Sequence, residues 1–286
     1  MKIDLHLHSS HSKRSSQWVL QKIGCPESFS PPVRQYELVR QKGMDMVTLT
    51  DHNTVEGCLE IAHLDGVFIS EEVTAYFPDD GCKAHVLCWD INEAIHEDLM
   101  KARQNVFDLA AYLQENDIMH ALAHPLFSIN NKLTVEHFEK FLLLFKNFEM
   151  NGARDQGQNR ILREVLTGLD QTVMERLMAK HGLVPDFADP WKKNLTGGSD
   201  DHSSLNPARM YTEVEGAGDL ASFWRGLATG QAKAQGRAST PLTLAHNLYG
   251  IAYQFAKSRY NLERYTGMDM LMRFLDQLLE PANGSS

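Results

Sequence analysis

The sequence contains few cysteines. Four occur in 286 residues, at Cys25, Cys58, Cys82 and Cys88, and no two of them have the C-x-x-C spacing of a zinc knuckle. In a reducing compartment these residues are expected to be plain thiols, and the pattern argues against a thiolate metal site.

Long apolar runs and an excess of positive charge are also missing. No apolar stretch is long enough to cross a bilayer, and the N-terminus lacks the apolar segment of a signal peptide. We therefore expect a cytoplasmic protein without a membrane partner. The formal net charge is −9, which argues against a nucleic-acid partner. It does not exclude an anionic substrate, because bound metal ions can reverse the local charge.

Short apolar strands and helices alternate over the first two hundred residues. Strands are predicted at residues 3–8, 44–50, 67–74, 85–89, 119–124, 148–150, 183–187 and 194–197. Helices are predicted at residues 32–40, 55–63, 92–115, 134–146 and 155–180. This alternation is typical of an α/β fold with a parallel sheet, and seven or eight such units favour a closed barrel.

The C-terminal segment has a different character. Residues 242–260 and 268–279 are strongly helical, and no strand follows them. We therefore divide the chain into a barrel at residues 1–238 and a helical extension at residues 239–286. The extension is expected to pack on the barrel or on a partner, such as a downstream domain or a second copy in a homo-oligomer.

A His-x-His pair lies in the first predicted strand. Because side chains alternate between the two faces of a strand, His6 and His8 share one face about 7 Å apart. Such a pair can converge on one metal ion, although two buried histidines can also serve only the core.

Further metal-capable residues occur at the ends of the other predicted strands. They are Asp51 and His52, Glu71 and Glu72, His85, His124, Asp200, Asp201 and His202. The carboxyl ends of parallel barrel strands open on one face, where active sites lie. Taken singly, several of these residues could instead cap a helix or lie in solvent, but together they predict one cluster.

The ligand types define the chemistry. Imidazole and carboxylate groups without thiolate suit zinc, manganese or iron. The candidates exceed what one ion requires, so two or three divalent ions are expected. Ions about 4 Å apart activate water and stabilise the attacking and leaving oxygens of a phosphoryl transfer, so hydrolysis is the natural reaction class.

The ordered motifs resemble those of the PHP (polymerase and histidinol phosphatase) family. They are His6-Leu7-His8, Thr50-Asp51-His52-Asn53-Thr54, Glu72-Val73, His85-Val86-Leu87, Ala123-His124-Pro125 and Ser199-Asp200-Asp201-His202. The resemblance covers roughly residues 1–210. It implies a distorted (β/α)7 barrel of PHP type, here with extra C-terminal helices, and up to three metal ions.

The resemblance also implies how the ligands are shared. One ion would be held by His6, His8, Glu72 and Asp200, a second by Glu72, His85 and His124, and a third with help from His52 and His202. Glu72 is preferred to Glu71 because the family's glutamate usually precedes a β-branched residue and Ser or Thr. The implied nucleophile is a metal-bridging hydroxide that attacks phosphorus.

The sequence departs from the family pattern after the His-x-His pair. Many members carry an aspartate or a histidine there as a ligand of the third ion, whereas this chain has Lys13, with His11 nearby. Two ions are therefore expected to bind, and the third site is expected to be weak or empty. The predicted catalytic residues are Asp51, Arg154 and Lys13, and Arg154 is preferred over Lys13 and Arg14 as the cation that binds phosphate.

Three functions remain open at this stage. The leading hypothesis is a phosphoesterase that cleaves a phosphate ester of a small metabolite or nucleotide. The second is an accessory or non-catalytic metal-binding module of a glycosyltransferase-linked system. The stretches at residues 15–20 and 71–77 resemble that subgroup of the family. The third is hydrolysis of a C–N bond by a related barrel amidohydrolase, which is expected to use a carboxylated lysine or another bridging group from a barrel strand, and no lysine lies at a suitable strand end.

Overall fold

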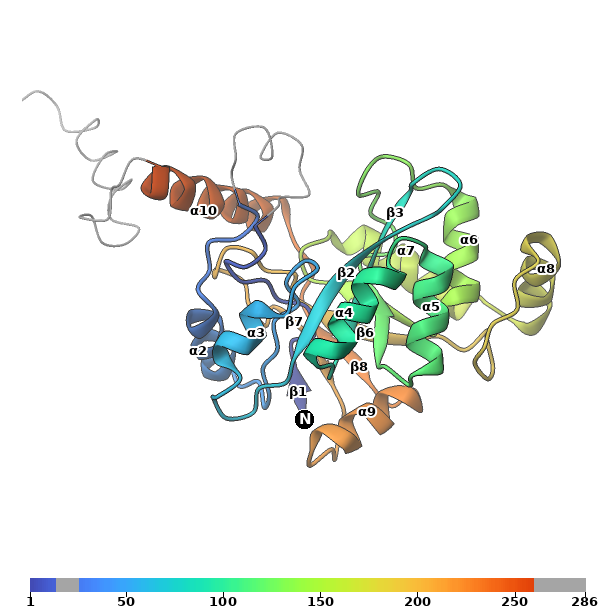
Figure 1. The fold of residues 1–286 in the computed structure, drawn as a ribbon, viewed down its shortest axis with the longest axis horizontal. Helices are drawn as coiled ribbons and strands as arrows, with labels where there is room; N and C mark the ends of the chain where they lie inside the picture. The colour runs from blue at the N-terminus through green and yellow to red at the C-terminus, as the bar shows by residue number, and fades with distance from the viewer. Residues whose placement is uncertain (14–25, 260–286) are drawn as a thin grey trace, which may run out of the picture.

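The computed structural model describes residues 1–13 and 26–259 (Figure 1). Its strands are β1 (Lys2–Ile3), β2 (Ser70–Tyr76), β3 (Lys83–Trp89), β4 (His120–Leu122), β5 (Asn147–Asn151), β6 (Asn194–Gly198), β7 (Met210–Glu213) and β8 (Lys233–Gly236). Its helices are α2 (Pro32–Gln41), α3 (Glu56–Ile61), α4 (Glu93–Ala102), α5 (Val106–Glu115), α6 (Val135–Leu144), α7 (Gln156–Thr167), α8 (Gln171–His181), α9 (Leu220–Ala228) and α10 (Pro241–Arg259). The fold is therefore mixed α/β.

The larger sheet has the order β2-β3-β4-β5-β6. β4, β5 and β6 are parallel, but β3 is antiparallel to both β2 and β4. The prediction of a parallel sheet therefore holds for β4 to β6 and is wrong for the pairs that β3 makes. The physical reason is clear at the first pair, because the short loop at residues 77–82 can close a hairpin but is too short for a parallel crossover.

The smaller sheet has the order β1-β7-β8 and is antiparallel. Neither β7, β8 nor the intervening α9 was predicted from the sequence. Of the strand predicted at residues 3–8, only Ile3 lies in a ladder, as the second residue of β1. The described strands thus form two sheets and no continuous barrel ladder.

A few backbone hydrogen bonds outside the ladders connect the segments between the two sheets. The amide of His8 donates to the carbonyl of Asp201 at 3.2 Å, and the amide of Thr50 donates to the carbonyl of Leu7 at 2.7 Å. The amide of Glu72 donates to the carbonyl of Asp51 at 3.2 Å. The N-terminal segment therefore lies between the end of β6 and the segment that precedes α3.

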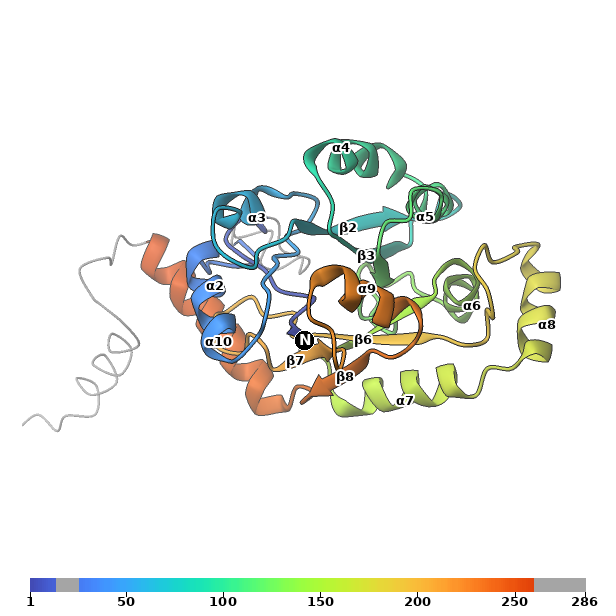
Figure 2. The same cartoon turned by 90° about the horizontal axis from the view of Figure 1, so that it is seen from below.

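Two of the predicted long helices are divided by capping residues. Asn105 caps α5 by accepting a hydrogen bond from the amide of Phe107, and Asp170 caps α8 in the same way through Val173. The helix predicted at residues 134–146 is confirmed, with Thr134 as its cap. Residues 183–187 form no strand. Figure 2 shows α4 and α7 on opposite sides of the strands.

The main core lies between the larger sheet and α4 to α7. Val73, Val86, Leu109, Phe141 and Phe148 are all buried in this cluster. Because strand side chains alternate, the face of β2 that carries Val73 packs on the helices, and the opposite face, which carries Glu72, is available to a site.

The C-terminal segment is helical up to Arg259, as expected, and the predicted helix at residues 268–279 lies outside the described residues. α10 contacts the loop after β6, because Asn247 accepts hydrogen bonds from Ser203 at 2.9 Å and Asn206 at 2.6 Å. The division of the chain at residue 238 remains a prediction. None of the described helices is both long and apolar enough to cross a membrane.

The cysteines within the described residues are Cys58, Cys82 and Cys88, and all three are buried free thiols. Cys25, Arg14 and the stretch at residues 15–20 lie outside the described part of the chain.

Candidate metal centre

His6 and His8 lie side by side at the centre of the protein. Both rings are fully buried, and their Nε2 atoms are 2.9 Å apart. The predicted sharing of one strand face is therefore present, although the segment that carries these residues belongs to no ladder at this point.

Glu72 and Asp200 complete a set of four ligand atoms with these histidines. The Oε2 atom of Glu72 lies 3.1 Å from His6 Nε2 and 3.2 Å from His8 Nε2. The Oδ1 atom of Asp200 lies 3.4 and 3.5 Å from the same nitrogens. Adjacent ligands of a tetrahedral zinc ion are about 3.3 Å apart, given its bond lengths of about 2.0 to 2.1 Å. The four atoms therefore have the spacing of one metal site.

The second oxygen of Glu72 faces two further rings. Its Oε1 atom lies 2.7 Å from His85 Nδ1 and 3.1 Å from His124 Nε2. The carboxylate thus lies between two groups of histidines, as a bridging ligand would. Glu71 points the other way, toward His96 on α4, whose Nδ1 lies 2.9 Å from Glu71 Oε1.

His52 and His202 lie beside His8. The ring nitrogens of these three histidines fall within 4.8 Å of one another, and His52 forms a second group with Glu72 and His85. Glu27 contacts both outer rings, with its oxygens 3.0 Å from His52 Nε2 and 3.8 Å from His202 Nε2. The sequence offered no signal for Glu27, because it lies in a loop without a periodic pattern.

The charges in the cluster strongly perturb its titration. Burial alone would raise the pKa of Glu72, yet the rings of His85 and His6 hold that pKa well below its ordinary value. The pKa of Asp200 is also held well below its ordinary value, because the effects of His6 and His8 exceed the opposing effect of burial. Both carboxylates are therefore ionised in the metal-free protein.

The histidines divide into two classes. Burial alone would lower the pKa of His6, but Glu149 and Glu72 raise it well above its ordinary value. Asp200 and Glu72 similarly raise the pKa of His8 to about 10. Burial instead lowers the pKa of His85 to about 4. The carboxylates therefore favour the protonated forms of His6 and His8 in the absence of metal.

An outer layer of polar groups fixes the histidine rings. Glu149, in the middle of β5, accepts a hydrogen bond from His6 Nδ1 at 2.7 Å. Its other oxygen accepts from the amide of His124 and from the side chain of Asn151. The sequence reasoning missed Glu149, although a lone glutamate between Phe148 and Met150 in a buried strand is a signal that could have found it.

Asp51 belongs to this outer layer. Its carboxylate accepts hydrogen bonds from the amide and hydroxyl of Ser9 and from the hydroxyl of Ser12. Ser12 in turn lies 3.0 Å from His8 Nδ1. The structure therefore places Asp51 where it positions His8 through Ser12, and its predicted catalytic role remains a prediction.

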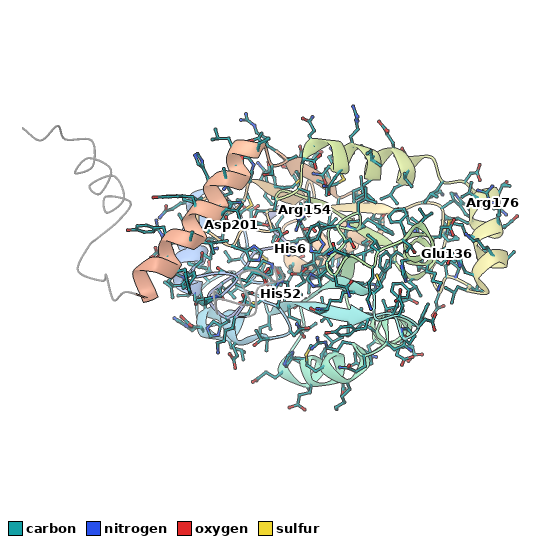
Figure 3. All side chains as sticks on the ribbon, turned by 90° about the horizontal axis from the view of Figure 1, so that it is seen from above. His6, His52, Glu136, Arg154, Arg176 and Asp201 are labelled. Atoms are coloured by element: carbon teal, nitrogen blue, oxygen red, sulfur yellow. The ribbon has the colours of Figure 1, made fainter. Side chains whose placement is uncertain are left out.

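Of the two predicted cations within the described residues, Arg154 lies closer to the cluster. Its Nη2 atom is 3.6 Å from Asp200 Oδ2, and its guanidinium lies 3.7 Å from the ring centroid of Phe127. Its buried Nε atom makes no hydrogen bond within the described residues. Lys13 is exposed and lines the neighbouring cavity. Figure 3 shows Arg154 near His6 and His52, far from Glu136 and Arg176.

The backbone is strained where it carries two of the ligands. Asp200 and His124 have φ angles of 51° and 28°, a region that residues other than glycine rarely adopt. Gly198 allows β6 to approach the N-terminal segment, because a Cβ atom there would lie 2.3 Å from the Cβ of His6. Close packing thus brings residues that are far apart in the sequence, such as His6 and Asp200, into one site.

The donor set fits divalent metal ions. Nitrogen and oxygen ligands are present and thiolates are absent among the clustered side chains, which suits zinc, manganese or iron. The buried nitrogens His52 Nδ1, His85 Nδ1 and His202 Nε2 make no hydrogen bond within the described residues. A metal ion would satisfy such nitrogens, because it accepts their lone pairs.

A cavity of about 270 Å³ opens beside the cluster. It is bounded by His52 and His85 at one end and by Tyr76, Lys83 and Arg103 at the other. This volume is suited to a small molecule.

No protein-family model matches the chain. An uncharacterized protein from Methanocaldococcus jannaschii is 36% identical over 73 residues, which make up 26% of this chain and 41% of that protein. The chain therefore spans about two fifths of the length of the curated relative that it matches.

Several solved structures are similar to this chain. PsfC from Pseudomonas syringae has a TM-score of 0.52 at 14% identity, and the match covers 90% of this chain and 98% of PsfC. A two-domain Bacteroides vulgatus protein is described as containing a predicted PHP-like metal-dependent phosphoesterase. It has a TM-score of 0.49 at 11% identity, and the match covers 83% of this chain and 65% of that protein. The lesion-specific endonuclease EndoQ from Pyrococcus furiosus has a TM-score of 0.47 at 14% identity, and the match covers 82% of this chain and 57% of EndoQ. The likeness to PsfC shows a shared fold.

Proposed function

We propose that this protein is a metal-dependent phosphoesterase that cleaves a phosphate ester of a small metabolite or nucleotide. The observation that carries the proposal is the position of Glu72, whose two carboxylate oxygens lie between separate groups of histidines. A shared carboxylate holds two cations near each other and reduces their repulsion, as two-metal hydrolysis requires.

We also propose that the fold is a distorted barrel of PHP type. Backbone hydrogen bonds connect the His6-His8 segment to the end of β6 on one side and to Thr50 on the other. The segment at residues 50–53 is in turn bonded to β2, the first strand of the larger sheet. These bonds support a ring of seven segments around the candidate metal centre.

The proximity of the side chains suggests which residues would hold each metal ion. His6, His8, Glu72 and Asp200 would hold one divalent ion, and Glu72, His85 and His124 a second. His52 and His202, now with Glu27, would hold a third. Bound zinc, manganese or iron supplies Lewis acidity, which lowers the pKa of water and withdraws charge from phosphoryl oxygens.

The other residues prepare these ligands and bind the substrate. Glu149 accepts the Nδ1 proton of His6, and Ser12 lies at the Nδ1 of His8, so both Nε2 lone pairs are free to bind metal. Arg154 binds phosphoryl oxygens, because its guanidinium is stacked on Phe127 and its Nε lacks a partner in the described residues.

The test combines metal analysis with a screen of phosphoesters. The chain loaded with manganese or zinc is expected to hold at least two ions and to hydrolyse a phosphomonoester such as p-nitrophenyl phosphate. Fewer than one ion per chain, with no hydrolysis of any phosphoester, would contradict the proposal. Tight metal binding without hydrolysis would favour an accessory module instead.

Glu72 and Glu71 provide a matched pair of variants for this test. Glu72→Gln is expected to lose bound metal and activity, because an amide bridges two cations poorly. Glu71→Gln makes the same chemical change one residue away, where the side chain contacts His96, so it is expected to retain both. Equal metal content in the two variants would contradict the bridging role of Glu72.

A further inference from the structure

The cavity beside the metal centre has a cationic far end. Its lining includes Tyr76, Lys83 and Arg103, which take no part in the candidate metal sites. The carboxylates that also line it are engaged elsewhere, because Glu27 contacts His52 and Glu56 contacts His11.

Strand register fixes where this end lies. On β2, Thr74 and Tyr76 follow Glu72 on the same face, and they pair with His85 and Lys83 of β3. A step of two residues along a strand is about 7 Å. The Tyr76–Lys83 pair therefore lies about 7 Å beyond the Thr74–His85 pair, in the direction away from Glu72.

The two cations converge on one aromatic ring. The Nζ atom of Lys83 lies 5.9 Å from the Tyr76 ring centroid, and the guanidinium carbon of Arg103 lies 5.7 Å from it. Arg103 is held in place, because its Nε donates to the carbonyl of Thr74 at 2.8 Å and its Nη2 to the Tyr76 hydroxyl at 3.4 Å.

Among the described residues no carboxylate oxygen lies within 4.0 Å of either cation, and the electrostatic partner of Arg103 is the buried Glu71 on the other face of β2. Lys83 and Arg103 both line the cavity next to Tyr76, so this part of the lining is positively charged and can attract an anion.

We propose that the substrate of this site carries a second anionic group, a phosphate or a carboxylate, which Lys83 and Arg103 attract to this end of the cavity while the ester phosphate lies at the metal centre. This inference rests on the proposed phosphoesterase function. The cavity volume of about 270 Å³ restricts the substrate to a small, doubly anionic metabolite.

Three non-hydrolysable probes of similar length test the proposal. They are pentane-1,5-bisphosphonate, 6-phosphonohexanoate and pentylphosphonate, compared by calorimetry and as inhibitors of p-nitrophenyl phosphate hydrolysis by the metal-loaded protein. We expect the first or second probe to bind at least about tenfold more tightly than pentylphosphonate, because only they carry a second anion. The better of the two identifies phosphate or carboxylate as the favoured group.

Lys83 variants locate the effect. Lys83→Met keeps the aliphatic stem and is expected to remove the tenfold preference without changing hydrolysis of p-nitrophenyl phosphate, whereas Lys83→Arg is expected to keep it. Lys140→Met is the matched control, because Lys140 also lies over a ring, that of Phe77 at 5.6 Å, but does not line the cavity.

The outcomes separate this inference from the function on which it rests. If p-nitrophenyl phosphate is hydrolysed but all three probes bind equally, the anion site is wrong and the phosphoesterase stands. A preference that survives Lys83→Met also overturns the assignment. If no phosphoester is hydrolysed but the bisphosphonate binds through Lys83, the anion site stands and the phosphoesterase is wrong.

Discussion

His6 and Glu149 form a buried carboxylate–histidine pair, with 2.7 Å between Nδ1 and Oε1. The orientation of the carboxylate is fixed, because its second oxygen accepts hydrogen bonds from the amide of His124 at 2.8 Å and from Asn151 at 2.9 Å. A histidine that donates Nδ1–H to a carboxylate presents its Nε2 lone pair to a metal ion.

We predict that Glu149→Gln weakens metal binding about 10- to 100-fold, because the ring of His6 loses its charged partner. Metal affinity is measured by competition with a chelator of known affinity. Glu139→Gln is the control, since Glu139 also contacts a histidine, His181, at 2.7 Å but lies away from the site. Unchanged affinity in Glu149→Gln would show that Glu149 does not support the metal centre.

We predict that Arg154→Ala lowers kcat/KM for a phosphoester about 10- to 100-fold, the typical effect of losing a charged hydrogen bond. Arg154→Lys is expected to retain only part of the wild-type kcat/KM, because an ammonium group cannot reproduce a planar guanidinium stacked on Phe127. Metal content is expected to persist, since Arg154 carries the same sign of charge as the ion. Arg160→Ala, on the exposed face of α7, is the control.

We predict that metal affinity rises with pH between about 6 and 9. In the metal-free protein burial lowers the pKa of His8, but Asp200 and Glu72 raise it to about 10, so an entering ion must displace that proton. Each displaced proton contributes about a tenfold gain in affinity per pH unit. Calorimetry in buffers of different ionisation enthalpy measures the protons released, and release of none would contradict this prediction.

The metal-free protein is expected to show the opposite trend. The folded pKa of His8 lies above the unfolded value of about 6.5, so its stabilising effect is complete below that pH and disappears toward pH 10. Melting temperatures of chelator-treated and metal-loaded samples should therefore diverge as the pH rises. Parallel curves would show that His8 does not link protons to metal.

Local patterns predicted much of the fold. The predicted starts of the helices at residues 134 and 155 agree with α6 and α7 to within one residue, and in the structure the side chains of Thr134 and Asp155 cap these helices by accepting hydrogen bonds from nearby backbone amides. The antiparallel arrangement of β3 was not predictable from periodicity, because alternation is the same in parallel and antiparallel strands. β8 was missed because its side chains are largely exposed and lack an apolar face.

The site was predictable where ligands follow apolar strands. The structure brings together the predicted His6, His8, Glu72, His85, His124 and Asp200, and it places His52 and His202 beside them. Glu27 and Glu149 were missed for different reasons. Glu27 reaches the centre only through the folding of a loop, whereas Glu149 was hidden in a strand that was read as apolar core.

The contact between Gly198 and His6 has a consequence for synthesis of the protein. His202 follows His8 by 194 positions, and ribosomes add about 5 to 20 residues each second. The first two histidines therefore emerge about 10 to 40 s before the ligands with which they must assemble. A nascent chain that ends before Asp200 contains His6 and His8 but lacks the aspartate that completes their ligand set. Stable binding of a metal ion during synthesis would therefore indicate that β6 has already packed against the N-terminal segment.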